Sequence, residues 1–156
     1  DKTERDQYMN SEFTIAVHAL VFLNHKRESV SSDKLAANIC TNPARVRKIM
    51  GKLKKKGLIS TKEGVVGGYL FDLDPSKVTL YDVSSALDVP FVSSSWRSGG
   101  SDLPCLVASG MAGIMDDIYG TLDQLCKDYL KQVTIQTIDQ KIFGSSTVKE
   151  NENEKI

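Results

Sequence analysis

Basic side chains are concentrated in one stretch of this 156-residue chain. Nine lysines and arginines lie between Lys34 and Lys62 with no acidic residue among them, although the net charge of the whole chain is zero. A solvated helix face normally mixes both signs, because like charges one turn apart repel each other by about a few tenths of a kcal/mol. A phosphate backbone would relieve that repulsion, so the stretch has the electrostatic character of a nucleic-acid-binding surface. The alternative is a surface helix whose lysines only interact with water.

Charge is also distributed unevenly between the two halves of the chain. Residues 9–82 contain twelve Lys/Arg and seven Asp/Glu, whereas residues 83–156 contain six Lys/Arg and ten Asp/Glu. The first half is therefore the expected partner of a polyanion, and the acidic second half is a candidate surface for a protein partner.

Three helices are predicted to position the basic residues. The first begins at Phe13 and carries a broad apolar face. The second begins after an N-cap at Ser31 or Ser32, and the third begins after Asn42, with Pro43 at its first position. The third helix presents an apolar stripe to the core: Val46, Ile49, Met50 and Leu53. A helix, a short turn and a capped helix form the helix-turn-helix pattern.

A β-hairpin is predicted directly after the basic helix. Residues 58–61 and 69–73 alternate as strands do, and a glycine-rich turn joins them. Val65 and Val66 form the tip of this hairpin, which is the wing of a winged helix. A short helix capped by Thr79 follows. The sequence thus predicts a mainly α winged helix-turn-helix domain over residues 9–87.

The rest of the chain is predicted to form a dimerisation arm. Residues 88–102 are rich in turn-forming types and are expected to be a connector loop. Helices are expected over residues 103–143, the first capped by Asp102 and the last by Thr134. Apolar residues of the long helix recur at heptad-like spacing and form the expected dimer interface: Met111, Ile114, Ile118, Leu122, Leu125 and Tyr129.

The two ends of the chain are expected to lie outside this domain. Residues 1–8 are interpreted as a remnant of cloning, because Met9 begins a sequence that looks like a natural start. Residues 144–156 are polar and charged, and are predicted to be a disordered tail.

Three segments resemble a known bacterial family. Residues 57–60 (GLIS) and 64–70 (GVVGGYL) resemble the wing of the Rrf-type winged-helix transcriptional regulators, the IscR/NsrR/CymR-like family. Residues 80–83 (LYDV) are similar to another segment of that family, and the resemblance covers residues 9–86 well. It implies a homodimeric regulator, expected to be a repressor, that binds a duplex DNA operator with its third helix and wing. The residues expected to contact DNA are Ser32, Thr41, Arg45, Arg47, Lys48, Lys52, Val65 and Val66.

The cysteines depart from the pattern of cluster-binding family members. Some members hold an iron–sulfur cluster on three cysteines before the long helix, but Cys105 is the sole cysteine between residues 88 and 105. We therefore expect no iron–sulfur cluster and no metal site; the alternative is a cluster held by Cys105 together with non-cysteine ligands. Cys105 is predicted at the third helical position after Asp102, where the helix N-terminus would lower the pKa of the thiol and make it a redox sensor. The alternative is an inert cysteine. Cys40, Cys126 and Trp96 are expected to be packing residues, although Trp96 could line a ligand pocket.

Other function classes find little support in the sequence. There is no P-loop, GxSxG or HExxH motif, so we do not expect an enzyme. No apolar run is long enough for a membrane span, and the odd number of scattered cysteines favours the cytoplasm. A winged-helix protein-docking module without specific DNA binding is the alternative function. The sequence specifies neither the operator nor an effector.

Overall fold

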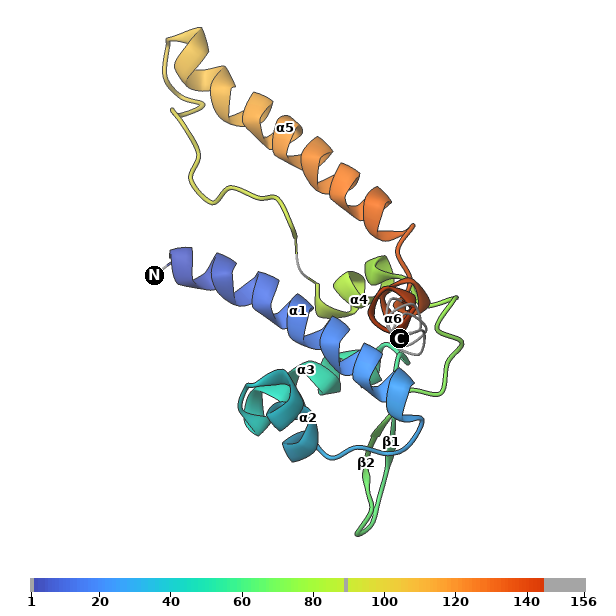
Figure 1. Ribbon diagram of the computed structural model, residues 1–156. Coiled ribbons are helices and arrows are strands. Elements are labelled where there is room, and N and C mark those ends of the chain that lie inside the picture. Colours follow the sequence, from blue (N-terminus) through green and yellow to red (C-terminus); the bar gives the residue numbers. More distant parts are fainter. Residues whose placement is uncertain (1, 89, 145–156) are drawn as a thin grey trace, which may run out of the picture.

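The structure is a computed structural model that describes residues 2–88 and 90–144. Its elements in chain order are α1 Lys2–Lys26, α2 Ser32–Ile39, α3 Pro43–Lys55, β1 Ser60–Lys62, β2 Gly68–Leu70, α4 Leu80–Leu87, α5 Leu106–Leu130 and α6 Ile135–Phe143. Figure 1 shows α2, α3, α4 and the hairpin gathered around α1, whereas α5 extends away from this body. The predicted fold class, mainly α with a hairpin wing and a long C-terminal helix, is confirmed.

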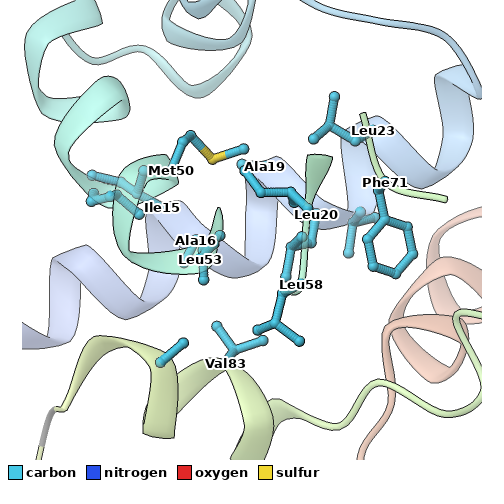
Figure 2. Close-up of a cluster of buried hydrophobic side chains, with 14 of the residues drawn as sticks. Ile15, Ala16, Ala19, Leu20, Leu23, Met50, Leu53, Leu58, Phe71 and Val83 are labelled. Carbon is cyan, nitrogen blue, oxygen red and sulfur yellow. The ribbon is translucent and has the colours of Figure 1, made fainter. Parts of the chain in front are cut away.

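The core of the winged domain lies between α1, α3 and α4. Leu20 and Leu23 of α1 are fully buried, and Met50 and Leu53 of α3 pack in the same cluster with Val83 of α4 (Figure 2). The apolar stripe predicted for the third helix is buried at all four positions. This stripe turns one side of α3 inward, so its other side must face solvent.

Helix N-caps at the predicted positions begin four of the helices. Ser31 accepts a hydrogen bond from the Lys34 N–H at the start of α2, and Asn42 accepts one from the Arg45 N–H at the start of α3. Thr79 is the N-cap of α4 and Thr134 is the N-cap of α6, each in a capping box. These caps satisfy N–H groups that have no partner within the helix, and they depend on residues only three positions apart.

The first helix is longer than predicted. α1 begins at Lys2, whereas the apolar periodicity starts only at Phe13. Extending an existing helix costs little once its first turn has formed, so a polar segment without periodicity can continue it. The interpretation of residues 1–8 as a cloning remnant stays a prediction. The predicted disordered tail falls, except for Gly144, outside the described residues.

The hairpin is shorter than predicted and is held against the loop after α1. Ser60 pairs with Leu70 and Lys62 with Gly68 in an antiparallel register. The N–H of Tyr69 donates to the Val30 carbonyl at 2.8 Å, and the Val30 N–H donates to the Tyr69 carbonyl at 2.9 Å. This short bridge fixes the base of the wing relative to α2.

The start of the long helix corrects one prediction. α5 begins at Leu106 with Cys105 as its N-cap residue, so Asp102 is not the cap and Cys105 is not at the third helical position. The reason is a turn closed by the Leu103 N–H and the Gly100 carbonyl at 3.1 Å, which takes up Asp102 before the helix can begin. Among the described residues, no helix is both long and apolar enough to cross a membrane.

Candidate nucleic-acid interface

The exposed side of α3 carries the basic residues that point away from the core. Arg47, Lys48, Lys54 and Lys55 are exposed on this side, together with the small residues Ala44 and Gly51. The two sides alternate with helical spacing, because the buried stripe occupies the intervening positions. We call the set Ala44, Arg47, Lys48, Gly51, Lys54 and Lys55 the exposed face of α3. It contains no acidic residue.

Arg47 connects the exposed face to the start of α2. Its Nη1 donates a hydrogen bond to Ser32 Oγ at 3.3 Å. The other predicted residue of this region, Thr41, is half-buried in the turn between the two helices, with its N–H bonded to the Ala36 carbonyl. The structure thus brings Ser32 and Arg47 together, and it leaves the Arg47 guanidinium accessible.

Arg45 lies on a different side of α3. It is half-buried, and its Nη2 donates a hydrogen bond to Ser11 Oγ of α1. Position 45 precedes Val46 by one residue and therefore turns toward α1 when Val46 enters the core. The structure places Arg45 where it joins two helices, away from the exposed face.

A buried carboxylate of α1 neutralises part of the basic helix. Glu12 is 6% exposed, and its carboxylate pairs with Lys52 Nζ at 2.8 Å and with Lys48 Nζ at 3.3 Å. Burial acts to raise the pKa of Glu12, but hydrogen bonds and positive charge from Lys52 and Lys48 outweigh it and lower the pKa below its ordinary value. Lys52 is therefore held at the edge of α3, while Lys48 keeps most of its exposure.

Sequence reasoning missed Glu12, although one signal was present. Glu12, Ala16, Ala19 and Leu23 follow one another at spacings of four, three and four residues. An acidic residue that continues a buried apolar stripe requires a partner, because an unpaired buried charge is costly. The excess of basic residues on α3 could have identified that partner.

The wing presents an apolar tip. Val65 and Val66 are exposed at the end of the hairpin, in a turn closed by the Gly67 N–H and the Gly64 carbonyl at 2.9 Å. Lys54 Nζ of α3 donates to Thr61 Oγ1 of β1 at 2.9 Å. The hairpin is thus attached to the same helix that carries the basic face.

The long helix leaves its predicted seam uncovered. Met111 is half-buried, and the other apolar seam residues are between 42% and 62% exposed: Ile114, Ile118, Leu122, Leu125 and Tyr129. This apolar stripe continues along a 25-residue helix, whereas ordinary exposed apolar residues are scattered singly over a protein surface. It is a surface that another apolar surface could cover.

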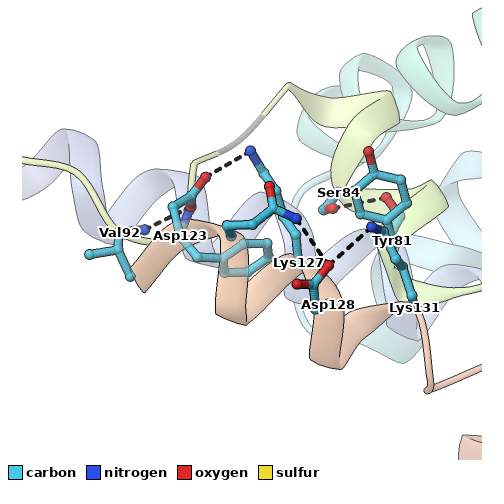
Figure 3. Close-up of polar contacts among 9 residues, drawn as sticks. Tyr81, Ser84, Val92, Asp123, Lys127, Asp128 and Lys131 are labelled. Atoms are coloured by element: carbon cyan, nitrogen blue, oxygen red, sulfur yellow. Dashed lines mark hydrogen bonds and ion pairs between the residues drawn. The ribbon is translucent and has the colours of Figure 1, made fainter. Parts of the chain in front are cut away.

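The opposite side of α5 is anchored to the connector. Asp123 is buried, and its carboxylate accepts hydrogen bonds from the N–H groups of Phe91 at 2.8 Å and Val92 at 3.1 Å. It also pairs with Lys127 Nζ at 2.7 Å, as Figure 3 shows. Burial favours a higher pKa for Asp123, but these donors lower it overall. The carboxylate therefore stays charged and holds the connector against the arm.

The three cysteines have different surroundings. Cys105 is exposed, and the N–H groups of Ala108 and Val107 at the start of α5 lower the pKa of its thiol. The expected direction of this shift is confirmed, although the position within the helix differs. Cys40 and Trp96 are both exposed, so the prediction that their side chains pack in the protein is wrong. Cys40 is the C-cap residue of α2 and has a left-handed backbone conformation. Cys126 is half-buried.

Comparisons with known proteins agree with this architecture. A family model described as Rrf2, an iron-dependent transcriptional regulator, matches residues 9–141. YwnA of Bacillus subtilis, which bears the name of an HTH-type transcriptional regulator, is 33% identical over 79 residues, and the match covers 51% of this chain and 58% of YwnA.

Solved structures show the same fold. A Lactobacillus plantarum protein described as a transcriptional regulator has a TM-score of 0.77 at 25% identity, with 93% of this chain and 98% of that chain covered. CymR (YrzC), the global cysteine regulator of B. subtilis, has a TM-score of 0.62 at 15% identity, with 83% and 94% covered.

The residues that the structure describes do not form a site for the iron that this family description names. Among the described residues, no group of three or more His, Cys, Asp or Glu side chains could hold a metal ion. Cys105, at the end of the connector, is a single exposed thiol, and Cys40 lies in the winged domain. An iron or iron–sulfur centre needs several such ligands around one point.

Proposed function

Because this chain belongs to the Rrf2 family of transcriptional regulators, we propose that it acts as a homodimer that binds operator DNA in the cytoplasm and represses transcription. The family consists of regulators rather than enzymes. The observation that carries the proposal is the exposed face of α3, which combines accessible Arg and Lys side chains with small residues and lies beside an exposed wing.

The proposed contacts follow from the position of each side chain. The exposed face of α3 enters the major groove, where the Arg47 guanidinium can donate two hydrogen bonds to a guanine edge. Lys48, Lys54 and Lys55 contact phosphates, which supply affinity rather than sequence preference. Val65 and Val66 enter the neighbouring minor groove, where apolar side chains can wedge between bases. Arg45 and Lys52 support the helix from the side of α1.

The proposed dimer forms through the apolar seam of α5. Two copies that pair along this seam cover apolar side chains that a single chain leaves exposed. A two-fold axis then presents two α3 helices to successive major grooves on one side of the duplex. This arrangement predicts an operator with two inverted half-sites.

The experiment is enrichment of a random-sequence duplex library by the full chain, followed by affinity measurements over a series of salt concentrations. We expect one enriched sequence with inverted half-sites, and affinity that falls steeply with salt because phosphate-bound counterions are released. Enrichment of no sequence, or binding that does not respond to salt, would refute DNA recognition and favour the protein-docking module.

Cys105 is the proposed redox-sensitive residue of this regulator. The lowered pKa of its thiol favours the reactive thiolate, and its place at the junction of connector and α5 would let oxidation disturb the dimer. We expect an oxidant to abolish binding to the enriched duplex in the wild type and not in Cys105→Ser. Equal loss in both proteins, or no loss in either, would show that the regulatory signal acts elsewhere.

A further inference from the structure

Gly51 lies in the middle of the exposed face of α3. Its neighbours on that face are Arg47 and Lys48, one turn before it, and Lys54 and Lys55, one turn after it. Apart from its two chain neighbours and the backbone of its own helix, no heavy atom lies within 4 Å of the position that a Cβ would occupy at Gly51. Space is therefore available for a side chain, and basic residues flank that space on both sides.

The other glycines of the winged domain have local reasons for being glycine. Three have positive φ angles of 74°, 107° and 155°, respectively: Gly57, Gly64 and Gly68. At Gly67, an added Cβ would lie 2.5 Å from the Lys62 carbonyl oxygen. Gly51 shares neither feature, since its backbone is helical and its surroundings are open.

A glycine in a helix interior has a thermodynamic cost. It loses more conformational freedom on folding than any other residue, and only proline is less favourable within a helix. Contacts within the protein do not offset this cost at position 51, because no atom approaches the site of the missing Cβ. On the exposed face of α3, between basic residues, the missing side chain leaves space for another molecule to approach the helix backbone.

We propose that Gly51 determines specificity by allowing the closest approach between α3 and DNA. This inference rests on the proposed function. Glycine is the residue that lets another molecule come near a backbone. A methyl group at this position would hold α3 away from the floor of the major groove and lengthen the hydrogen bonds between Arg47 and base edges. Flexible lysines would still reach phosphates, so specific binding suffers more than non-specific binding.

The test compares Gly51→Ala and Gly51→Leu with the wild type. The probes are the duplex that the wild-type chain enriches from a random library and a scrambled duplex of the same length. We expect Gly51→Ala to raise Tm by about a few degrees while weakening binding to the enriched duplex about tenfold. Gly51→Leu should bind more weakly still, whereas affinity for the scrambled duplex should change less than about twofold.

The pair of substitutions separates crowding from stiffening of the helix. Alanine and leucine have similar helix propensities but different volumes, so a loss that grows with side-chain size indicates steric contact with DNA. Equal losses for the two variants would overturn the proposal, because they would indicate a need for flexibility in α3. A fall in Tm for Gly51→Ala would also overturn it, because the site would then not be open.

Gly120→Ala is the matched control. Gly120 is an exposed helical glycine of α5 with equally open surroundings, and its position two residues from both Ile118 and Leu122 places it opposite the apolar seam. The Gly120→Ala substitution should raise Tm without changing DNA affinity.

A Gly51→Ala protein that binds the enriched duplex as tightly as the wild type would refute the role of Gly51. A wild-type chain that enriches no sequence would instead refute the proposed function.

Discussion

Arg45 and Arg47 differ by two positions in α3 and have different surroundings. The Arg47 guanidinium is exposed beside Ser32, whereas Arg45 is half-buried and bonded to Ser11 of α1. The sequence pattern assigns both to DNA contact, because it shows only that they belong to one basic helix. The direction of each side chain depends on how deeply Val46 and Ile49 pack.

Substitution of the two arginines should separate recognition from stability. We expect Arg47→Ala to weaken binding to the enriched duplex by about 1–3 kcal/mol and to leave Tm nearly unchanged, because its side chain is exposed. Arg45→Ala should lower Tm, because it removes a contact between helices. Titration by electrophoretic mobility shift and thermal unfolding measure the two effects. Lys77→Ala, which removes one exposed charge outside α3, is the control, and an Arg47→Ala protein with wild-type affinity would contradict the expectation.

Glu12 should make folding stability dependent on acid. Its pKa is lowered in the folded protein, so the stability it contributes is present above its ordinary pKa of 4.5 and is lost as pH falls through the lowered value. We therefore expect Glu12→Gln to be less stable than the wild type at about pH 7, with a smaller loss of stability on acidification. Urea unfolding at about pH 7 and about pH 3 measures this difference. Glu28→Gln, at an exposed position near the end of α1, should behave like the wild type; an equal pH dependence of Glu12→Gln and the wild type would show that the ion pairs contribute nothing.

At the level of elements, the wing depends on the close contact of Gly68 with the loop after α1. A Cβ at Gly68 would lie 2.3 Å from the Val30 carbonyl oxygen, closer than real contacts allow. The two hydrogen bonds between Val30 and Tyr69 require that approach. The wing is therefore a docked element, not a free hairpin.

Gly68→Ala should separate the wing from this loop. We expect a loss of at least roughly 2 kcal/mol in the free energy of unfolding, together with faster hydrogen exchange at the Val30 and Tyr69 amides. Gly64→Ala is the control for backbone strain alone, because Gly64 also has a positive φ but open surroundings. Unchanged exchange at both amides in Gly68→Ala would contradict the docking described here.

At the level of the whole molecule, the two sides of α5 have different roles. One side holds the connector through the buried Asp123 carboxylate, and the other exposes the apolar seam. Isolated exposed apolar side chains are ordinary, whereas continuous apolar stripes mark contact sites. We therefore expect the proposed dimer and the proposed DNA interface to be coupled through the two half-sites of the operator.

Leu125→Glu should convert the protein to a monomer. A carboxylate in a closed apolar seam would be desolvated without a partner, so we expect the dimer dissociation constant to rise by at least about tenfold. Operator affinity should fall with it, because one half-site alone engages one α3 helix. Sedimentation velocity and mobility-shift titrations measure both quantities. Gln124→Glu adds the same charge one residue away, outside the seam, and should stay dimeric; a dimeric Leu125→Glu protein would place the interface elsewhere.

Local chemistry explains the elements that could be predicted from the sequence. The caps at Ser31, Asn42, Thr79 and Thr134 involve side chains and N–H groups three residues apart, so short windows of sequence contain the whole signal. The buried stripe of α3 and the exposed seam of α5 follow from helical periodicity in the same way. The winged helix with a long arm follows from these local patterns and their order along the chain.

Contacts between distant residues are not contained in short windows of sequence. Glu12 meets Lys48 and Lys52 across separations of 36 and 40 residues, and this pairing holds Lys52 at the edge of the basic helix. The start of α5 likewise depends on a turn that competes with Asp102 for the role of cap. Composition and periodicity therefore establish a basic winged helix, whereas packing of α1 against α3 selects the side chains that face outward. Packing has this role because side-chain direction changes by about 100° with each helical residue.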